Sequence, residues 1–157
     1  MHVPSLGRRG EGWVALQIVA LALVLVSGWA GPAWPASWTA ALRLAGAVLV
    51  VGGVVLAVAA TRSLGSSLTA LPRPAPSASL REDGVYARAR HPIYGALLLV
   101  ALGFAALTSW WAVVAWGFLL GVLLAKSARE EVWLAERYPG YPAYRARVTR
   151  RFVPFVG

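Results

Sequence analysis

Four apolar segments alternate with polar stretches along the chain, and their lengths suit helices that cross a membrane. With the polar residues that extend two of them, they cover residues 13–30, 39–60, 91–108 and 110–127. A helix needs about 20 residues to cross the hydrocarbon core of a bilayer, with about 17 as the lower bound. The pattern therefore predicts an all-α integral membrane protein with about four transmembrane helices, built as one membrane domain.

The third and fourth segments meet at Thr108-Ser109. So short a connection predicts a tight antiparallel helical hairpin, and Ser109 suits the N-cap position of the fourth helix. Gly117 and Gly121 lie on one face of that helix. They either favour close approach of another helix, within the chain or between two copies, or occur by chance in a segment rich in glycine and alanine.

Lysine and arginine are distributed unevenly between the connections, which predicts the orientation in the membrane. Arginines precede the first segment, recur through the connection 61–90, and follow the fourth segment together with Lys126. Cytoplasmic connections carry the excess of these residues, so both termini and the connection 61–90 are predicted to be cytoplasmic; Arg43 is the exception. Tryptophans mark the opposite boundary, as interfacial indoles do: Trp29, Trp34, Trp38, Trp110 and Trp111. The first segment exceeds the roughly 7–15 apolar residues of a signal peptide, so we expect an uncleaved helix.

The amino-acid composition favours a membrane protein and argues against several kinds of functional site. The chain is 59% hydrophobic, above the roughly 45–50% of soluble domains. It has no cysteine and only two histidines, which excludes disulfides and a thiolate nucleophile and argues against a metal site. The net charge of +9 does not indicate nucleic-acid binding, because the basic residues flank apolar segments instead of forming one stripe.

The connection 61–90 ends in a polar cluster at the entrance of the third helix. Before it come a proline-rich, extended connector at 71–76 and a turn at 81–84. Pro92 suits the first turn of a helix, which places His91 at the positive end of the helix dipole. Together with Arg88 and Arg90 this makes a site for a carboxylate or phosphate. The positive-inside rule alone accounts for Arg88; for Arg90 the adjoining His-Pro-x-Tyr favours a function.

A second polar cluster, Glu130 and Glu131, follows the fourth segment. The short hairpin predicts that it returns to the face that carries Arg90. A simple Lys126–Glu130 pair is the alternative for the first glutamate, but Glu131 points to a neighbouring face. Residues 128–157 are predicted to form an amphipathic helix, ended by Pro139-Gly140, and a basic, aromatic segment that lies on the membrane surface or covers the site as a lid.

These clusters resemble one family in order and approximate spacing. Five pieces carry the resemblance: Gly84-Val-Tyr86, Arg90-His-Pro-x-Tyr94-Gly95, Glu130-Glu131-x-x-Leu134, Tyr141-x-x-Tyr144 and Arg147-Val148 with Pro154. Residues 63–157 are similar to isoprenylcysteine carboxyl methyltransferases and to the related small-membrane phospholipid methyltransferases. The two preceding helices match only in hydropathy.

The resemblance implies a cytoplasmic S-adenosylmethionine site and a lipophilic acceptor, with the carboxylate of a prenylcysteine-like or isoprenoid molecule as the leading candidate. By position, Tyr86, His91, Tyr94 and Glu130 correspond to cofactor-binding residues, and Arg90 and Glu131 to the residues most tied to catalysis. Substrate contact or a role in the lid is predicted for Arg88, Trp133, Tyr141, Tyr144 and Arg147.

Methyl transfer from a sulfonium needs alignment and exclusion of water, with no covalent intermediate. Arg90 would orient a carboxylate acceptor, and aromatic faces such as Tyr86, Tyr94 or Trp133 would attract the sulfonium. Two alternatives stay open at this point. One is a membrane reductase that uses NADPH, of sterol-reductase-like type, and the other is a non-enzymatic membrane scaffold.

Overall fold

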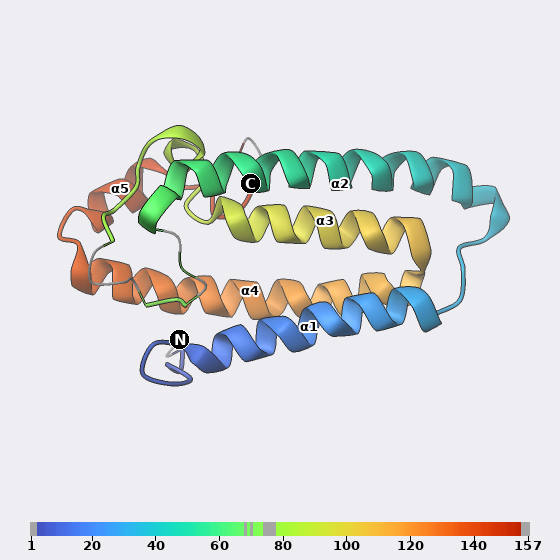
Figure 1. Cartoon of the computed structure of the whole chain (residues 1–157), viewed down its shortest axis with the longest axis horizontal. Helices are drawn as coiled ribbons and strands as arrows, with labels where there is room; N and C mark the ends of the chain where they lie inside the picture. Colours follow the sequence, from blue (N-terminus) through green and yellow to red (C-terminus); the bar gives the residue numbers. More distant parts are fainter. Residues whose placement is uncertain (1–2, 68, 70, 74–77, 155–157) are drawn as a thin grey trace.

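The computed structural model of the chain describes residues 3–67, 69, 71–73 and 78–154. Within these residues the regular elements are helices, with one isolated bridge between Ala33 and Ser109 and no strand, so the predicted all-α class is confirmed. The end of the proline-rich connector, residues 74–76, lies outside the described residues. In chain order the elements are α1 (Glu11–Ala30), α2 (Ala36–Leu64), η1 (Gly65–Ser67), η2 (Gly84–Ala87), α3 (Pro92–Thr108), α4 (Trp110–Arg137) and α5 (Tyr141–Arg147) (Figure 1).

Helix length and apolar surface make this an integral membrane protein. α1, α2 and α4 are each long and apolar enough to cross a bilayer, whereas α3 has 17 residues and is a shorter apolar helix. Large apolar side chains such as Val51, Val55 and Val114 are more than 60% exposed, as suits surfaces that face lipid tails instead of water. The fourth crossing and the tight hairpin stay predictions.

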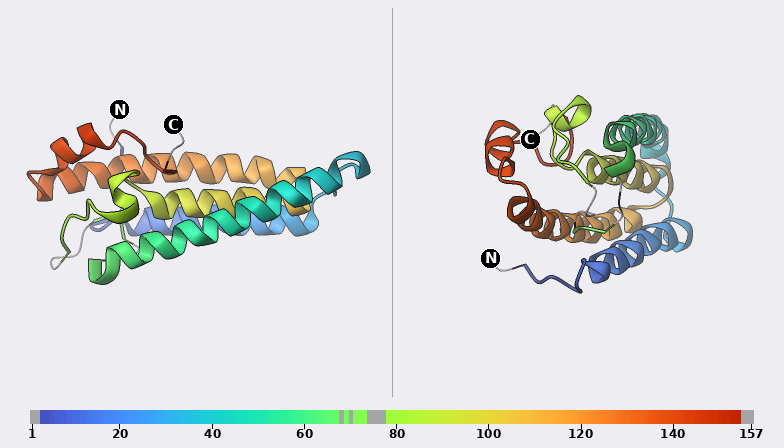
Figure 2. Two further views of the ribbon diagram at one scale, coloured as in Figure 1. Left: turned by 90° about the horizontal axis from the view of Figure 1, so that it is seen from above. Right: turned by 60° about the vertical axis from the view of Figure 1, so that its left-hand side comes forward.

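The helices pack in pairs, α3 mainly against α2 and α1 mainly against α4, as the two views of Figure 2 illustrate. Glycines allow the close approach of α2 to α3: a Cβ atom on Gly46 would lie 2.8 Å from the Gly103 carbonyl oxygen. Gly53 of α2 likewise faces α3, where an added Cβ would lie 3.0 Å from the Ala96 carbonyl oxygen. Gly117 and Gly121 are exposed and would have no atom within 4 Å of an added Cβ, because they face away from the other described helices.

Two residues start α3 and α4 as their chemistry predicts. Pro92 begins α3, directly after His91 as the N-cap residue. The Ser109 side chain caps α4 by accepting a hydrogen bond from the Trp111 amide at 3.2 Å. α4 then continues for 28 residues, about 42 Å at 1.5 Å per residue, so its last turns extend past the roughly 30 Å hydrocarbon core. That extension carries Glu130 and Glu131.

The polar clusters gather at one end of the bundle. Figure 1 shows α5 and the segment before α3 at the end opposite the α1–α2 connection. Pro139 and Gly140 separate α4 from α5, which lets the chain reverse and bring α5 back beside the entrance of α3. The polar clusters before α3 and near the end of α4 therefore meet, although 40 residues separate His91 from Glu131.

Candidate functional site

Glu131 is the centre of the first polar group at this end. Its Oε1 atom accepts a hydrogen bond from Arg90 Nε at 2.9 Å and lies 3.2 Å from His91 Nε2. Its Oε2 atom lies 3.3 Å from Arg145 Nε, and Arg151 Nε is 3.8 Å from Oε1. The Glu131 side chain is only 3% exposed. The predicted meeting of Arg90 with an acidic counterpart is thus present in the structure.

Arg90 also holds the C-terminal segment 148–152 in place. Its NH1 atom donates to the carbonyl oxygens of Val148 and Thr149 at 2.6 and 2.7 Å. The backbone adds two bonds, from the Arg90 amide to the Arg150 carbonyl and from the His91 amide to the Arg151 carbonyl. We call Arg90, Glu131 and the segment 148–152 the clamp. Three of the five guanidinium N–H donors of Arg90 are therefore used within the protein.

Gly95 is needed where the clamp crosses α3. A Cβ atom at this position would overlap the carbonyl group of Phe152, so only glycine lets the C-terminal backbone lie this close to the helix. The last glycine of the Arg90–Gly95 motif thus has a packing role. The Arg90–Gly95 motif, which the sequence assigns to the functional site, therefore also fixes the C-terminal segment.

The second polar group lies on the neighbouring face of α4. Tyr94 donates its hydroxyl hydrogen to Glu130 Oε2 at 2.7 Å, and His91 Nδ1 lies 3.7 Å from the same oxygen. The His91 and Tyr94 rings stack in parallel, with centroids 5.5 Å apart. Lys126 Nζ lies 5.0 Å from the Tyr94 ring centroid. Because Glu130 is bonded from another helix, an i, i+4 pair with Lys126 does not account for all of its contacts.

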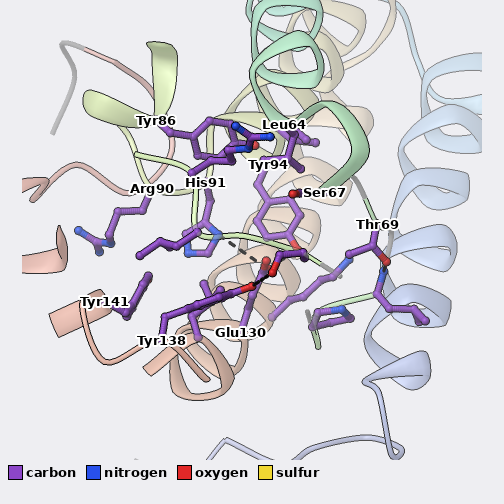
Figure 3. A pocket seen from close by; sticks show the side chains of 18 of the residues that line it. Leu64, Ser67, Thr69, Tyr86, Arg90, His91, Tyr94, Glu130, Tyr138 and Tyr141 are labelled. Carbon is purple, nitrogen blue, oxygen red and sulfur yellow. Dashed lines mark hydrogen bonds and ion pairs between the residues drawn. The ribbon is translucent and has the colours of Figure 1, made fainter. Parts of the chain in front are cut away.

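A cavity of about 440 Å³ lies against this second group (Figure 3). Seven predicted site residues line it: Tyr86, Arg90, His91, Tyr94, Glu130, Tyr141 and Tyr144. Figure 3 shows Glu130 and Tyr94 between Tyr141 on one side and Thr69 on the other. Leucines 64, 71, 80 and 134 add apolar wall, and Val14 and Gln17 bring α1 into the lining. Four predicted residues lie outside this lining: Arg88, Glu131, Trp133 and Arg147.

Those four residues have other contacts. Arg88 is exposed, Arg147 pairs with Glu82 at the surface, and Glu131 belongs to the clamp. Trp133 is buried beside Gly10 and beneath the Arg129 guanidinium, 4.5 Å from the ring centroid. The structure therefore separates the predicted set into a cavity group and a supporting or peripheral group.

Three buried tyrosines line the cavity near α5, and two of them, Tyr141 and Tyr144, differ in whether the hydroxyl has a hydrogen-bond partner. Burial raises the pKa of Tyr144 to about 12 and also raises the pKa of Tyr86 and of Tyr141, so all three remain protonated donors at neutral pH. Tyr144 donates to the Tyr86 carbonyl oxygen at 2.8 Å. Tyr141 is 1% exposed, and its hydroxyl has no partner among the described residues. Buried hydroxyls in proteins usually have a hydrogen-bond partner, so this hydroxyl is a donor that a ligand or a water molecule can use.

The phospholipid methyltransferase family model matches residues 42–140, which is well over half of the chain. The chain belongs to the phospholipid methyltransferase family. This confirms the family resemblance that the motifs predicted, and it makes the protein a membrane methyltransferase. Among curated proteins no match was found.

The phospholipid methyltransferase match covers α3 and α4 with both polar groups, and it stops just before α5. Tyr141, Tyr144 and the segment 148–152 therefore lie beyond the matched residues. The two tyrosines nevertheless line the cavity, and the segment is bonded to Arg90 and His91, which also line it. At the other side, Gln17 and Lys126 line the cavity, and neither is among the predicted site residues. Gln17 did carry a signal, because it is the strongest polar interruption in the first apolar segment.

Proposed function

We propose that this membrane methyltransferase uses S-adenosylmethionine and acts on a lipophilic acceptor, foremost the carboxylate of a prenylcysteine-like or isoprenoid molecule. One observation carries the proposal: within the residues that match a methyltransferase family, His91, Tyr94 and Glu130 converge on one cavity at the polar end of the bundle. The cavity volume of about 440 Å³ falls in the range of small-molecule pockets, about 300–1,000 Å³.

The donor groups of the cavity suit this cofactor. Glu130 is 23% exposed and bonded by Tyr94 at one oxygen, which leaves capacity to accept hydrogen bonds from an ammonium or from ribose hydroxyls. The buried Tyr141 hydroxyl supplies a donor without a protein partner. For the sulfonium, Tyr86 is the better placed aromatic ring, because Tyr94 is already flanked by His91 and Lys126.

The bound cofactor supplies a methyl group on a positively charged sulfur. The chain aligns this group with the acceptor and excludes water. A carboxylate acceptor needs no general base, so no residue has to remove a proton. We assign Arg90 and Glu131 a positioning role, since the clamp orders the segment next to the cavity, and their predicted part in catalysis stays a prediction.

Methyl transfer from labelled S-adenosylmethionine tests the activity. Purified protein is offered a membrane-lipid extract, a prenylcysteine analogue and phosphatidylethanolamine vesicles in parallel, and label is expected in a lipophilic product. Glu130→Gln, which keeps the shape and removes the charge, is expected to weaken cofactor binding about tenfold or more, the value of a charged hydrogen bond. Thermal stabilisation by NADPH and none by S-adenosylmethionine would instead favour the reductase alternative.

We also propose that α3 is a fourth crossing in a tight hairpin with α4, and that the cavity faces the cytoplasm, in accord with the arginine distribution. The absence of native cysteine permits a direct test with single cysteines at exposed positions. Ser37→Cys at the start of α2 is expected to react with an impermeant maleimide in intact cells. Ala143→Cys in α5 is expected to react only after permeabilisation; the reverse pattern would overturn the orientation.

A further inference from the structure

A buried lysine lies in the cavity wall on the membrane side of Glu130. Lys126 is 2% exposed and precedes Glu130 by one helical turn, about 6 Å along α4. Its Nζ atom donates to Gln17 Oε1 of α1 at 2.6 Å. Ionisable residues at such depth are costly, and they usually mark a functional site. A role in topology alone does not require that the ammonium point into a cavity and be held by a side chain of another helix.

The charges that line the cavity favour an anion at this place. Among the described residues that line it, three are basic, Arg81, Arg90 and Lys126, and one, Glu130, is acidic. Glu130 accepts its hydrogen bond from Tyr94, and Arg90 is bonded to Glu131 outside the lining. Gln17 is neutral, so its bond fixes the position of the Lys126 ammonium and adds no counter-charge; Glu130, one turn further along α4, is an acidic residue that acts on this ammonium electrostatically. An oxyanion that enters here would gain a charge-assisted hydrogen bond in a site shielded from water.

We propose that Lys126 and Gln17 form an oxyanion subsite that binds the anionic group of the lipid acceptor and so determines acceptor specificity; this inference rests on the proposed function. Val14, Leu64 and Ile93 line the same cavity, and they suit the apolar chain attached to such a group. The anionic group belongs either to a carboxylate that itself receives the methyl group or to a phosphate close to a methylated amine.

Both sources give balanced reactions. With a carboxylate, the new C–O bond forms as the C–S bond of the methyl donor breaks. The negative charge of the acceptor and the positive charge of the sulfur both disappear, and no proton moves. With a phosphate-bearing lipid, an unprotonated amine forms the new C–N bond as the C–S bond of the methyl donor breaks. The sulfur leaves as a neutral thioether, the positive charge passes to the methylammonium product, and the phosphate stays bound to Lys126.

The test compares Lys126→Met with the wild type on three acceptors: a prenylcysteine analogue, phosphatidylethanolamine vesicles and a long-chain alkylamine that lacks an anionic group. We expect KM for the anionic acceptor in use to rise about tenfold or more, as for loss of a charged hydrogen bond. KM for the alkylamine should stay unchanged or fall. Lys126→Arg should restore part of the affinity, and Gln17→Leu should give a smaller rise than Lys126→Met.

Two controls separate this result from general damage. Arg62→Met removes one exposed positive charge near the same end of the bundle, outside the cavity lining, and should leave KM unchanged. Thermal stabilisation by S-adenosylmethionine should be the same in Lys126→Met and the wild type, which also shows that the variant folds.

The outcomes separate the two proposals. A rise in the KM of Lys126→Met for the prenylcysteine analogue alone identifies the anion as the acceptor carboxylate. A rise for the phosphatidylethanolamine vesicles alone identifies it as phosphate. An unchanged KM for every anionic acceptor that the wild type uses, or lost stabilisation by the cofactor, overturns the subsite and leaves the methyltransferase. A wild type that transfers methyl to no acceptor overturns both proposals.

Discussion

Glu130 and Glu131 are adjacent in sequence, but the regions they belong to differ in how completely their polar groups are paired. Glu131 is 3% exposed and has Arg90, His91 and Arg145 around its carboxylate. Glu130 is 23% exposed and has Tyr94 as its hydrogen-bond donor. Residues one apart on a helix face different directions, so one points into the clamp and the other into the cavity.

Within this one cluster of charges, the difference separates residues that support the fold from residues that are able to bind reactants. A buried ionic group whose capacity is filled by protein partners stabilises a particular arrangement of the chain, provided that no partner is removed. A group that keeps unused capacity beside a cavity can bind a ligand. On this criterion the clamp holds the C-terminal segment, and the cavity residues bind the reactants. His91 belongs to both regions, since its two ring nitrogens face the two glutamates.

Glu131→Ala is expected to have the largest effect on folding. It leaves the Arg90 guanidinium, 7% exposed, without its carboxylate partner, and breaking a buried ion pair in this way costs about 3–5 kcal/mol. Thermal unfolding in detergent should show a large fall in Tm. Glu130→Gln should change Tm far less in the absence of ligand. Equal losses of stability in the two variants would contradict the division into clamp and cavity.

Gly95→Ala tests whether the clamp depends on the close approach of backbone to helix. The added methyl group would overlap the Phe152 carbonyl, and overpacking of this kind costs about 1–3 kcal/mol. Gly121→Ala is the matched control, because no atom lies within 4 Å of an added Cβ at this exposed position in α4. It should be neutral or stabilising by up to about 1 kcal/mol. A Tm for Gly95→Ala equal to that of Gly121→Ala would show that segment 148–152 does not lie on α3.

Much of the helical framework could be predicted because it depends on local chemistry. Ser109 caps α4 through its own side chain, and Pro92 begins α3 because its ring fits the first turn. Hydropathy located the apolar helices for the same reason. Helix pairing depends on which faces meet in space, so the Gly46–Gly103 contact was not predicted. For the Gly117–Gly121 face the sequence left contact within the chain, contact between copies and chance open, and within the described residues an added Cβ atom there meets nothing.

The sequence indicated which residues gather at the candidate site better than it indicated how they contact one another. Residue types and spacing indicated Arg90, His91, Tyr94 and both glutamates, which the structure brings together. They carried no information on the carbonyl groups of segment 148–152, which occupy the Arg90 guanidinium. The sequence showed Gln17 as a polar interruption but not its contact with Lys126, because that contact depends on the packing of α1 against α4.

Tyr141→Phe is expected to have the smallest effect on folding. Whether it raises or lowers the stability of the unliganded protein shows whether Tyr141 belongs with the cavity or with the supporting residues. The lost hydroxyl has no partner among the described residues, so its removal relieves the cost of burying an unbonded polar group, about 1–3 kcal/mol at most. Without ligand the variant should be as stable as the wild type or more stable. Tyr144→Phe is the matched control, since it removes the bond to the Tyr86 carbonyl and should lower Tm.

The two variants should show the opposite order in how much S-adenosylmethionine raises their Tm. If the Tyr141 hydroxyl donates to a bound ligand, stabilisation by S-adenosylmethionine must be weaker in Tyr141→Phe than in the wild type, because the ligand loses a buried donor. Tyr144→Phe, whose hydroxyl is used within the protein, should keep most of that stabilisation relative to its own unliganded Tm. A Tyr141→Phe protein that is less stable without ligand and unchanged in cofactor binding would place Tyr141 with the supporting residues. Glu130, Tyr94 and His91 would then remain as polar residues proposed to bind the cofactor.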